Sequence, residues 1–380
     1  MSHSQPSALR RVWSFFFQSP LDWLILAVPV AFVIHYVPAL HNETLLFGIS
    51  AVGIIPLAGW MGRSTEAIAE RVGAGVGGLL NATFGNAAEL IIALMALSKG
   101  LSGVVKASLT GSIIGNLLLV MGASSLAGGL RFSKQTFNQT GARISATSMS
   151  LASIALIMPT VFHHAAHFKS SALTAGASQK LSLAIAIVLF ATYFVSLPFY
   201  LITHKGLFAG SVVAEECEPE ERKHSIWPSI ALLAFATLLV AFLSEFLVGA
   251  ISAAQQSLGL TETFVGVVIL AIIGNAAEHS TAVWAALKNN MELSIGVSIG
   301  SSMQVALFVT PVLVFASYAF GQPMDLEFTM AEIVAIVLAV WIAGQITGDG
   351  ESNWLEGVQL LSVYLILAIL FYFLPETAVH

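Results

Sequence analysis

Two glutamates stand in the middle of long apolar runs, each at the end of the same five-residue motif. The motif GNAAE occurs as Gly85–Glu89 and again as Gly274–Glu278. An ionised carboxylate near the centre of a lipid bilayer costs free energy, so a glutamate kept there usually binds an ion or carries a proton. The paired motifs therefore predict that Glu89 and Glu278 belong to one functional site.

The two motifs are part of an internal repeat. They lie 189 positions apart (274 minus 85), and the same offset aligns GSIIGNLLLV, which begins at Gly111, with GSSMQVALFV, which begins at Gly300. Within each motif the glycine and the glutamate are about one helical turn apart, on the same face. A helix that loosens at the glycine would free backbone carbonyl oxygens to face an ion beside the carboxylate.

Neutral oxygen-bearing side chains accompany both glutamates. They are the motif amides Asn86 and Asn275, and, in the two aligned segments, Ser112, Asn116, Ser301, Ser302 and Gln304. Carboxylates with neutral oxygens and no soft ligand suit a hard cation. Calcium accepts about six to eight oxygens in flexible geometry, whereas magnesium is reluctant to lose its water. Two carboxylates also match the charge of one divalent cation, so we predict a Ca2+ site.

Protons compete for the same oxygens. Burial and a like-charged neighbour both favour the neutral form of a carboxyl group, so we expect the pair to hold either the cation or protons. His279 follows Glu278, whereas Leu90 follows Glu89. His279 is a candidate third proton carrier, or else it caps a polar network. Glu245 is a candidate for the outer cation path, with an interfacial position as the alternative.

Other charged or metal-binding side chains lie near the ends of apolar runs. Arg63 and Glu66 are three residues apart, which predicts a local helical ion pair on an interfacial turn, with a cation entry funnel as the alternative. His163 and His167 have the i, i+4 spacing of a metal site. No cysteine or carboxylate stands near them in the sequence, so we expect a solvated helix end there.

The composition is that of an integral membrane protein. Hydrophobic residues make up 57% of the chain and charged residues only 9%, whereas soluble domains carry about 25% charged residues. The acidic excess comes without a basic stripe, which excludes a nucleic-acid partner. The single Cys217 excludes a disulfide within the chain. No HExxH zinc motif is present, and we expect neither an enzyme nor a bound cofactor.

Apolar runs of about 17–25 residues can cross a hydrocarbon core of roughly 30 Å, and they predict an all-α integral membrane protein. We count eleven such runs: 21–37, 44–62, 74–97, 102–130, 143–162, 180–203, 227–255, 262–287, 292–319, 328–347 and 354–374. The fourth, seventh and ninth are long enough to be tilted or broken. With a cytoplasmic N-terminus, only four of the 15 basic residues fall on the opposite side, as the positive-inside rule requires: Lys99, Lys106, Lys169 and Lys180.

The repeat divides these spans into one extra helix and two groups of five. Because five is odd, the two halves must lie upside down relative to each other, as in many secondary transporters. We expect a cytoplasmic N-terminus and first transmembrane helix in 1–43, a first inverted repeat in 44–205, an acidic cytoplasmic linker in 206–225 and a second inverted repeat in 226–380.

The motifs also carry a family resemblance. GNAAE, GNAAEH, GSSMQVALFV and the acidic EECEPEER between the halves resemble the Ca2+/H+ antiporters of the cation/proton exchanger family, over about Leu45 to Phe373. The resemblance implies eleven spans and a shared Ca2+ and H+ site. It assigns carboxylates, backbone oxygens, amides and residues of the facing helices to that site: Glu89, Glu278, Gly85, Gly274, Asn86, Asn275, Ser112, Ser301 and Gln304. The short N-terminal tail suggests a prokaryotic protein of the inner cell membrane.

Two other transport functions stay open from the sequence. One is a sodium-driven calcium exchanger of the same superfamily, although GNAAE lacks the proline that those relatives usually carry before the glutamate. The other is a cation channel, although channel filters usually arise from several like subunits or repeats. The expected partners are Ca2+, H+ and the lipid bilayer. The oligomeric state is not predicted.

Overall fold

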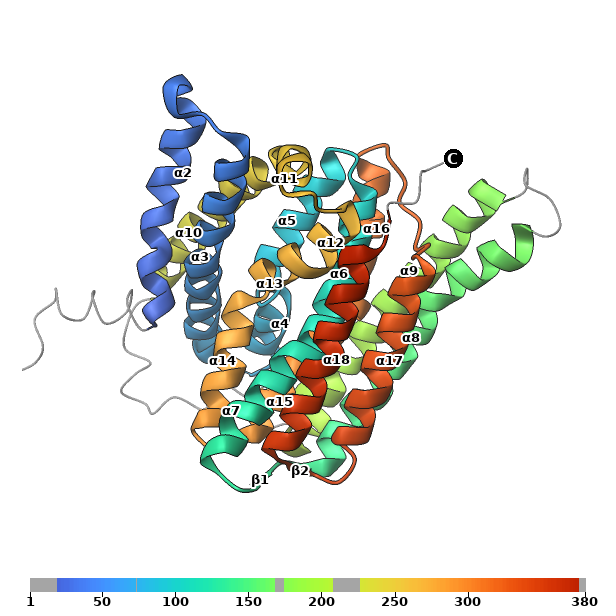
Figure 1. Ribbon diagram of the computed structural model, residues 1–380. Coiled ribbons are helices and arrows are strands. Elements are labelled where there is room, and N and C mark those ends of the chain that lie inside the picture. Colours follow the sequence, from blue (N-terminus) through green and yellow to red (C-terminus); the bar gives the residue numbers. More distant parts are fainter. Residues whose placement is uncertain (1–18, 73, 168–173, 208–225, 376–380) are drawn as a thin grey trace, which may run out of the picture.

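The computed structural model describes residues 19–72, 74–167, 174–207 and 226–375, which form a bundle of helices (Figure 1). The helices of the first half are α2 (Ala27–Tyr36), α3 (Glu43–Val72), α4 (Ala74–Phe84), α5 (Ala87–Ser98), α6 (Ser102–Ile114), η3 (Gly115–Val120), α7 (Met121–Arg131), α8 (Gln139–His167), α9 (Thr174–Pro198) and η5 (Phe199–Thr203). Those of the second half are α10 (Trp227–Gly249), α11 (Ile251–Leu258), α12 (Glu262–Phe264), η8 (Val265–Leu270), α13 (Ala271–Gly274), α14 (Ala276–Leu287), α15 (Met291–Gln304), η9 (Val305–Val309), α16 (Thr310–Ala319), α17 (Met330–Ile346) and α18 (Trp354–Phe373).

Three short 3-10 turns and one pair of short strands complete the described elements. The turns are η1 (Pro20–Leu26), η2 (Pro38–Leu40) and η6 (Lys205–Leu207), and the strands β1 (Gln135–Thr136) and β2 (Glu351–Ser352) pair antiparallel. The predicted all-α class is confirmed. Most of the predicted acidic linker, 208–225, lies outside the described residues.

Among the described residues, seven helical segments are long and apolar enough to cross a membrane, and an eighth candidate is the bent pair Ile251–Leu258 and Glu262–Gly274, which turns through 115°. Three shorter apolar helices, Pro20–Tyr36, Ala87–Ser98 and Met330–Ile346, also fall in predicted spans. The chain is therefore a multi-pass helical membrane protein. The exact number of spans remains a prediction.

Two of the predicted spans break at the GNAAE motifs, where loosened turns are expected. The range 74–97 divides at Gly85–Asn86 into α4 and α5, and the range 262–287 divides at Asn275, between α13 and α14. Asn86 has φ −95° and ψ 18°, and Asn275 has φ −104° and ψ 10°, values between the main allowed regions that do not continue a helix. Of the three long ranges, 227–255 divides after Gly249, whereas the other two continue through the π-helical turns η3 and η9.

The offset of 189 positions recurs in the helix boundaries. Helix α5 ends at Ser98 and α14 ends at Leu287, and these two positions are 189 apart (287 minus 98). Helix α6 begins at Ser102 and α15 at Met291, again 189 apart, and each runs into a π-helical turn. Equivalent stretches of sequence therefore adopt equivalent local structure in the two halves.

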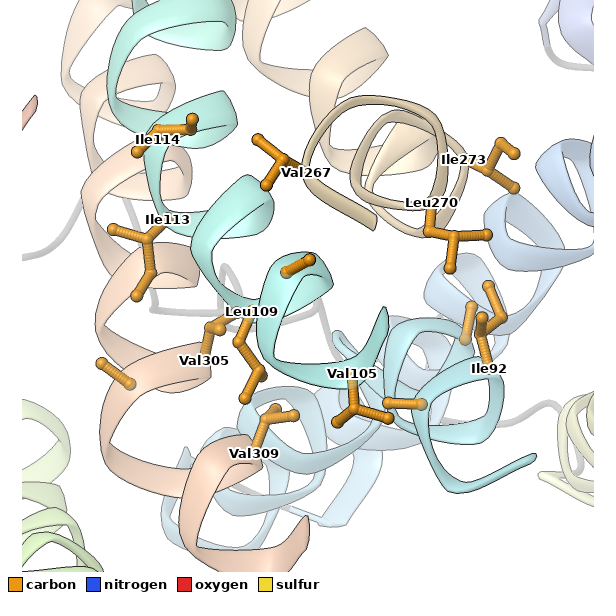
Figure 2. Close-up of a cluster of buried hydrophobic side chains, with 14 of the residues drawn as sticks. Ile92, Val105, Leu109, Ile113, Ile114, Val267, Leu270, Ile273, Val305 and Val309 are labelled. Carbon is orange, nitrogen blue, oxygen red and sulfur yellow. The ribbon is translucent and has the colours of Figure 1, made fainter. Parts of the chain in front are cut away.

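Apolar side chains from both halves pack together in the interior. Figure 2 shows side chains of α5, α6, η8 and η9 meeting in one cluster, in which Leu109, Ile113, Val267 and Val305 have no measurable exposure to solvent. Close packing of this kind supplies much of the attraction between helices in a membrane, where lipid is as apolar as the side chains. The cluster fixes the helices that carry the polar residues described below.

Glycine lets α6 and η8 approach each other closely at this crossing. A Cβ atom on Gly111 would lie only 2.1 Å from the carbonyl oxygen of Val267, and one on Gly266 would lie 2.4 Å from the Cβ of Ala107. Small residues at a crossing allow such close backbone approach. The contact joins α6 of the first half to η8 of the second.

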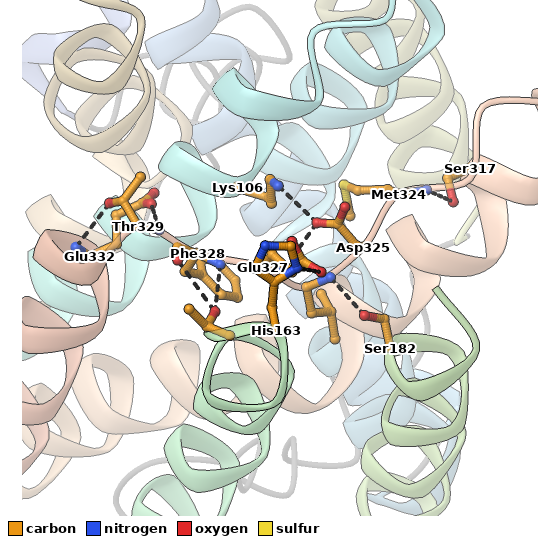
Figure 3. A network of polar contacts seen from close by, with 12 residues as sticks. Lys106, His163, Ser182, Ser317, Met324, Asp325, Glu327, Phe328, Thr329 and Glu332 are labelled. Atoms are coloured by element: carbon orange, nitrogen blue, oxygen red, sulfur yellow. Dashed lines mark hydrogen bonds and ion pairs between the residues drawn. The ribbon is translucent and has the colours of Figure 1, made fainter. Parts of the chain in front are cut away.

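An extended connection between α16 and α17 lies across α6, α8 and α9 (Figure 3). Its backbone N–H groups at Leu326 and Phe328 donate to the hydroxyls of Ser182 and Thr160 at 3.0 and 2.8 Å. Its acidic side chains also contact these helices: Asp325 forms an ion pair with Lys106 at 2.9 Å, and Glu327 Oε1 lies 3.0 Å from His163 Nδ1. Glu327, which is distant in the sequence, therefore lies beside His163, where no neighbouring carboxylate was expected from the sequence.

Candidate cation-binding site

Both glutamates sit at the start of a helix. Glu89 is the third residue of α5, and Glu278 is the third residue of α14, each directly after the break at its motif asparagine. The N-terminal end of a helix carries a partial positive charge that favours a nearby carboxylate. The helix breaks therefore place each acidic side chain where part of the cost of burying its charge is offset.

Serines from the neighbouring helices bind the two carboxylates in the same way. Ser112 of α6 donates to Glu89 Oε1, and Ser301 of α15 donates to Glu278 Oε2 at 2.7 Å. In each pair the serine follows the glutamate by 23 positions. The sequence offset had aligned these two serines with each other, and the structure places both against their predicted glutamates.

The motif asparagines link the two halves. Asn275 donates to the Ser112 hydroxyl at 2.9 Å, and the Ser301 hydroxyl, whose single proton also faces Glu278 Oε2, lies 3.1 Å from Asn86 Oδ1. Each asparagine thus bonds the serine that binds the other half's glutamate. The result is one continuous polar network rather than two separate sites.

Two amides of the predicted set extend this network. Asn86 donates to Gln304 Oε1 at 2.6 Å, and Asn116 donates to the Ser301 hydroxyl at 3.0 Å. Ser302, by contrast, donates to the backbone carbonyl oxygens of Ser298 and Ile113 at 3.0 and 3.4 Å. Its hydroxyl is therefore satisfied by backbone and does not contact the glutamates.

Glu89 is the more deeply enclosed of the two acids. Its side chain is only 4% exposed, and Asn275 lies close to the same carboxyl group. Its Oε2 atom nevertheless accepts no hydrogen bond of normal geometry from the described residues. A buried carboxylate oxygen without a donor is costly, so this atom is available to a proton or a cation.

Gly274 lies against Glu89. A Cβ atom on Gly274 would lie 3.4 Å from the Cβ of Glu89 and 3.7 Å from its Cγ, so the Glu89 side chain packs directly against the second GNAAE motif. The motif that carries Glu278 therefore also borders Glu89.

A polar cavity of about 220 Å³ leads to Glu278. Its wall includes Gly85, Gly274 and Ser301 at the inner end, and Asp22, Arg63 and Glu66 from η1 and α3. Glu89 does not contribute to this wall among the described residues. The cavity therefore borders Glu278 and not Glu89.

Two predicted path residues lie away from this cavity. His279 follows Glu278 in α14 and is half-buried, but it is not part of the cavity wall. Glu245 is exposed in the last turns of α10, where its backbone carbonyl accepts a hydrogen bond from Lys99 Nζ at 3.2 Å. Neither is brought to the network in the described part of the chain.

The sequence reasoning missed one charged residue of the cavity. Asp22 was treated as part of the first apolar span, and Arg63 was expected to pair with Glu66. In the structure Arg63 pairs with Asp22 at 2.7 Å, which corrects that expectation. The available signal was an isolated carboxylate at the start of an apolar run, in QSPLDWLIL.

Together these features define a class of protein: a multi-pass helical membrane protein with two buried carboxylates at the starts of broken helices, one of which borders a cavity. The sequence pattern of the family described as sodium/calcium exchanger protein matches this chain over residues 42–202 and 228–373. The chain belongs to this family. The match covers both GNAAE motifs and omits the segment between the halves.

Similar proteins agree with this membership. A protein of Synechocystis named Ca(2+)/H(+) antiporter is 47% identical over 365 residues, covering 93% of this chain and 96% of its own length. The Ca(2+)/H(+) antiporter ChaA of Bacillus subtilis is 44% identical, covering 87% of this chain and 93% of its own. A crystal structure of the Ca2+/H+ antiporter protein YfkE has 39% identity and a TM-score of 0.77, covering 93% of this chain and 99% of its own.

Proposed function

We propose that this protein exports Ca2+ from the cytoplasm in exchange for H+ by alternating access. The observation that carries the proposal is the hydrogen-bond network that joins the two acids. Glu89 and Glu278 each bond a serine, and an asparagine of the other half bonds the same serine. Relatives that are 44–47% identical are named Ca2+/H+ antiporters, which supports this choice of ions.

The donor set favours Ca2+ as the transported cation. In the described residues no group of three or more His, Cys, Asp and Glu side chains could hold a metal ion, so ligands beyond the two carboxylates must be neutral oxygens. Ser112, Ser301 and Gln304 supply such oxygens, and the freed carbonyls near Gly85 and Gly274 could supply more. A set of this kind, with adaptable geometry, suits Ca2+ better than Mg2+.

Exchange follows from competition at these oxygens. A cation that enters through the cavity meets Glu278 first, and it must pass Gly274 to reach the enclosed oxygen of Glu89. Protons held by the two carboxylates must leave as the cation binds, because the same oxygens cannot serve both. Once the access side changes, protons from the other side displace the cation.

We further propose the full eleven-helix architecture, with one N-terminal helix followed by two inverted five-helix repeats in 44–205 and 226–380. The equal offset of helix ends, serines and asparagines in the two halves supports this arrangement. With the N-terminus in the cytoplasm of a prokaryotic cell, the cavity beside Asp22 and Arg63 opens toward the cytoplasm, the side from which Ca2+ would be taken.

Ion replacement in proteoliposomes tests this function. The wild type should move Ca2+ when a proton gradient is imposed, whereas Glu89→Gln and Glu278→Gln should each lower the rate at least about tenfold. Glu351→Gln is the matched control, since Glu351 pairs with Lys134 on an exposed loop and its variant should keep the wild-type rate.

Three results would contradict the proposal in different ways. Full transport by both glutamine variants would show that the two acids are not the shared site. Faster Ca2+ movement under a sodium gradient than under a proton gradient would favour a sodium-driven exchanger. Ca2+ current without any counter-ion would indicate a channel.

A further inference from the structure

An arginine stands in the wall of the cavity through which the cation must pass. Arg63 of α3 lines the cavity together with Asp22 of η1 and Glu66 of α3. A guanidinium is always charged in proteins, and it repels a divalent cation twice as strongly as a monovalent one at the same distance. A cation path that contains Arg63 therefore needs a local means of cancelling its charge.

Asp22 provides that cancellation. Its Oδ1 atom accepts a hydrogen bond from an Arg63 guanidinium nitrogen at 2.7 Å, and its side chain is only 2% exposed, against 20% for Arg63. An enclosed ion pair is screened by solvent less than an exposed one. The negative charge of Asp22 therefore acts on Arg63 at short range and with little loss to solvent.

The backbone of η1 holds this carboxylate in place. Asp22 Oδ2 accepts a hydrogen bond from the Ser19 N–H at 2.8 Å, while the Ser19 hydroxyl accepts one from the Leu21 N–H at 3.3 Å. This reciprocal arrangement is a capping box, which fixes the first turn of a helix. Both oxygens of Asp22 are thus engaged, one by its own turn and the other by α3.

We propose that Asp22 is a positioning residue for cation entry, which anchors and neutralises Arg63 so that the cavity stays attractive to a divalent cation. This inference rests on the proposed Ca2+ transport. It gives the first helix, which lies outside the two repeats, a direct part in the cation path.

The test measures the Ca2+ dependence of transport and of equilibrium binding in detergent. Asp22→Asn leaves a free guanidinium in the wall, so the Ca2+ concentration for half-saturation should rise about tenfold, while the maximal rate changes little. The double variant Asp22→Asn with Arg63→Gln also lacks the guanidinium. Its Ca2+ concentration for half-saturation should return to within about threefold of the wild-type value. The shift in the single variant should also shrink as ionic strength is raised.

A second ion pair provides the matched control. Lys106 and Asp325 pair at 2.9 Å (Figure 3) and are not part of the cavity wall. Asp325→Asn removes one acidic partner of a similar pair, and it should leave the Ca2+ dependence unchanged. If Asp325→Asn shifted the Ca2+ dependence as much as Asp22→Asn does, the loss of any such ion pair would be enough to explain the effect.

Other outcomes overturn the inference directly. If Asp22→Asn keeps the wild-type Ca2+ concentration for half-saturation, the charge of Arg63 does not matter. If that concentration shifts equally in the single and double variants, Asp22 acts only on the fold. If Asp22→Asn is not recovered folded, Arg63→Gln alone decides. If Arg63 repels the cation, the Ca2+ concentration for half-saturation in that variant should equal the wild-type value or fall below it. If the ion pair serves only the fold, that concentration should rise.

The binding measurement separates this inference from the proposed function. If the wild type binds Ca2+ but shows no proton-driven exchange, the proposed function fails. The comparison of Asp22→Asn with the double variant still applies to binding in that case.

Discussion

Glu89 and Glu278 share a motif but not an environment. Glu278 borders the cavity, whereas Glu89 is 4% exposed and packs against Gly274. In the mechanism that we propose, Glu278 meets an incoming cation and Glu89 completes its coordination. In a protein with inverted repeats these two roles would exchange when the cavity opens on the opposite side.

The serine hydroxyls give a test at the level of single atoms. Ser301 donates to Glu278 Oε2 at 2.7 Å, and a hydrogen bond to a charged group contributes about 1.5–3 kcal/mol. Ser301→Ala should therefore weaken Ca2+ binding about tenfold or more, as measured by equilibrium binding of radioactive Ca2+.

A buried serine of the same helix serves as the control for this change. Ser298 donates to the carbonyl oxygen of Ser294 at 2.9 Å, within α15, and has no contact with either glutamate. Ser298→Ala should leave Ca2+ affinity within about twofold of wild type. Equal weakening by the two alanine variants would mean that Ser301 acts through the packing of α15 and not through Glu278.

At the scale of elements, glycine governs how closely the two halves approach. Gly111 and Gly300 are equivalent in the sequence repeat, yet a Cβ atom on Gly111 would lie 2.1 Å from Val267 O, whereas one on Gly300 would meet nothing within 4 Å. The close approach at Gly111 of α6 therefore has no counterpart at Gly300 of α15, which the repeat by itself does not predict.

This asymmetry leads to a prediction about stability. Gly111→Ala must push α6 away from η8, and overpacking of this kind typically costs about 1–3 kcal/mol. The variant should unfold at a clearly lower temperature in detergent, while Gly300→Ala should match the wild type in the same thermal scan. Equal unfolding temperatures for both variants would show that the crossing is not the close contact described.

The helix breaks show both what sequence can predict and where it fails. The GNAAE repeat predicted a loosened turn next to each glutamate, because glycine and asparagine adopt non-helical backbone angles easily. Apolar content alone gave continuous runs over 74–97 and 262–287, since hydropathy does not register the single residues, Asn86 and Asn275, at which the helices end.

At the scale of the whole molecule, the repeat was the most informative feature of the sequence. One offset brought together Glu89 with Glu278 and Ser112 with Ser301, because equivalent positions in two halves meet near their shared interface. It could not predict which acid the cavity reaches, since that depends on how the two halves are placed relative to each other.

Contacts between residues that the 189-position offset does not relate could not be predicted in this way. Asp22 meets Arg63 across 41 positions, and His163 meets Glu327 across the connection between α16 and α17. Neither pair has a periodic spacing that sequence could reveal, so both depend on tertiary packing.

Proton release on Ca2+ binding tests the central claim most directly. Ca2+ is added to purified protein in weakly buffered detergent solution at several pH values, and a pH indicator records the protons released. The wild type should release protons as Ca2+ binds, and Glu89→Gln with Glu278→Gln should neither bind Ca2+ tightly nor release protons. Tight Ca2+ binding by the wild type at every pH without any proton release would contradict a site shared by the two ions.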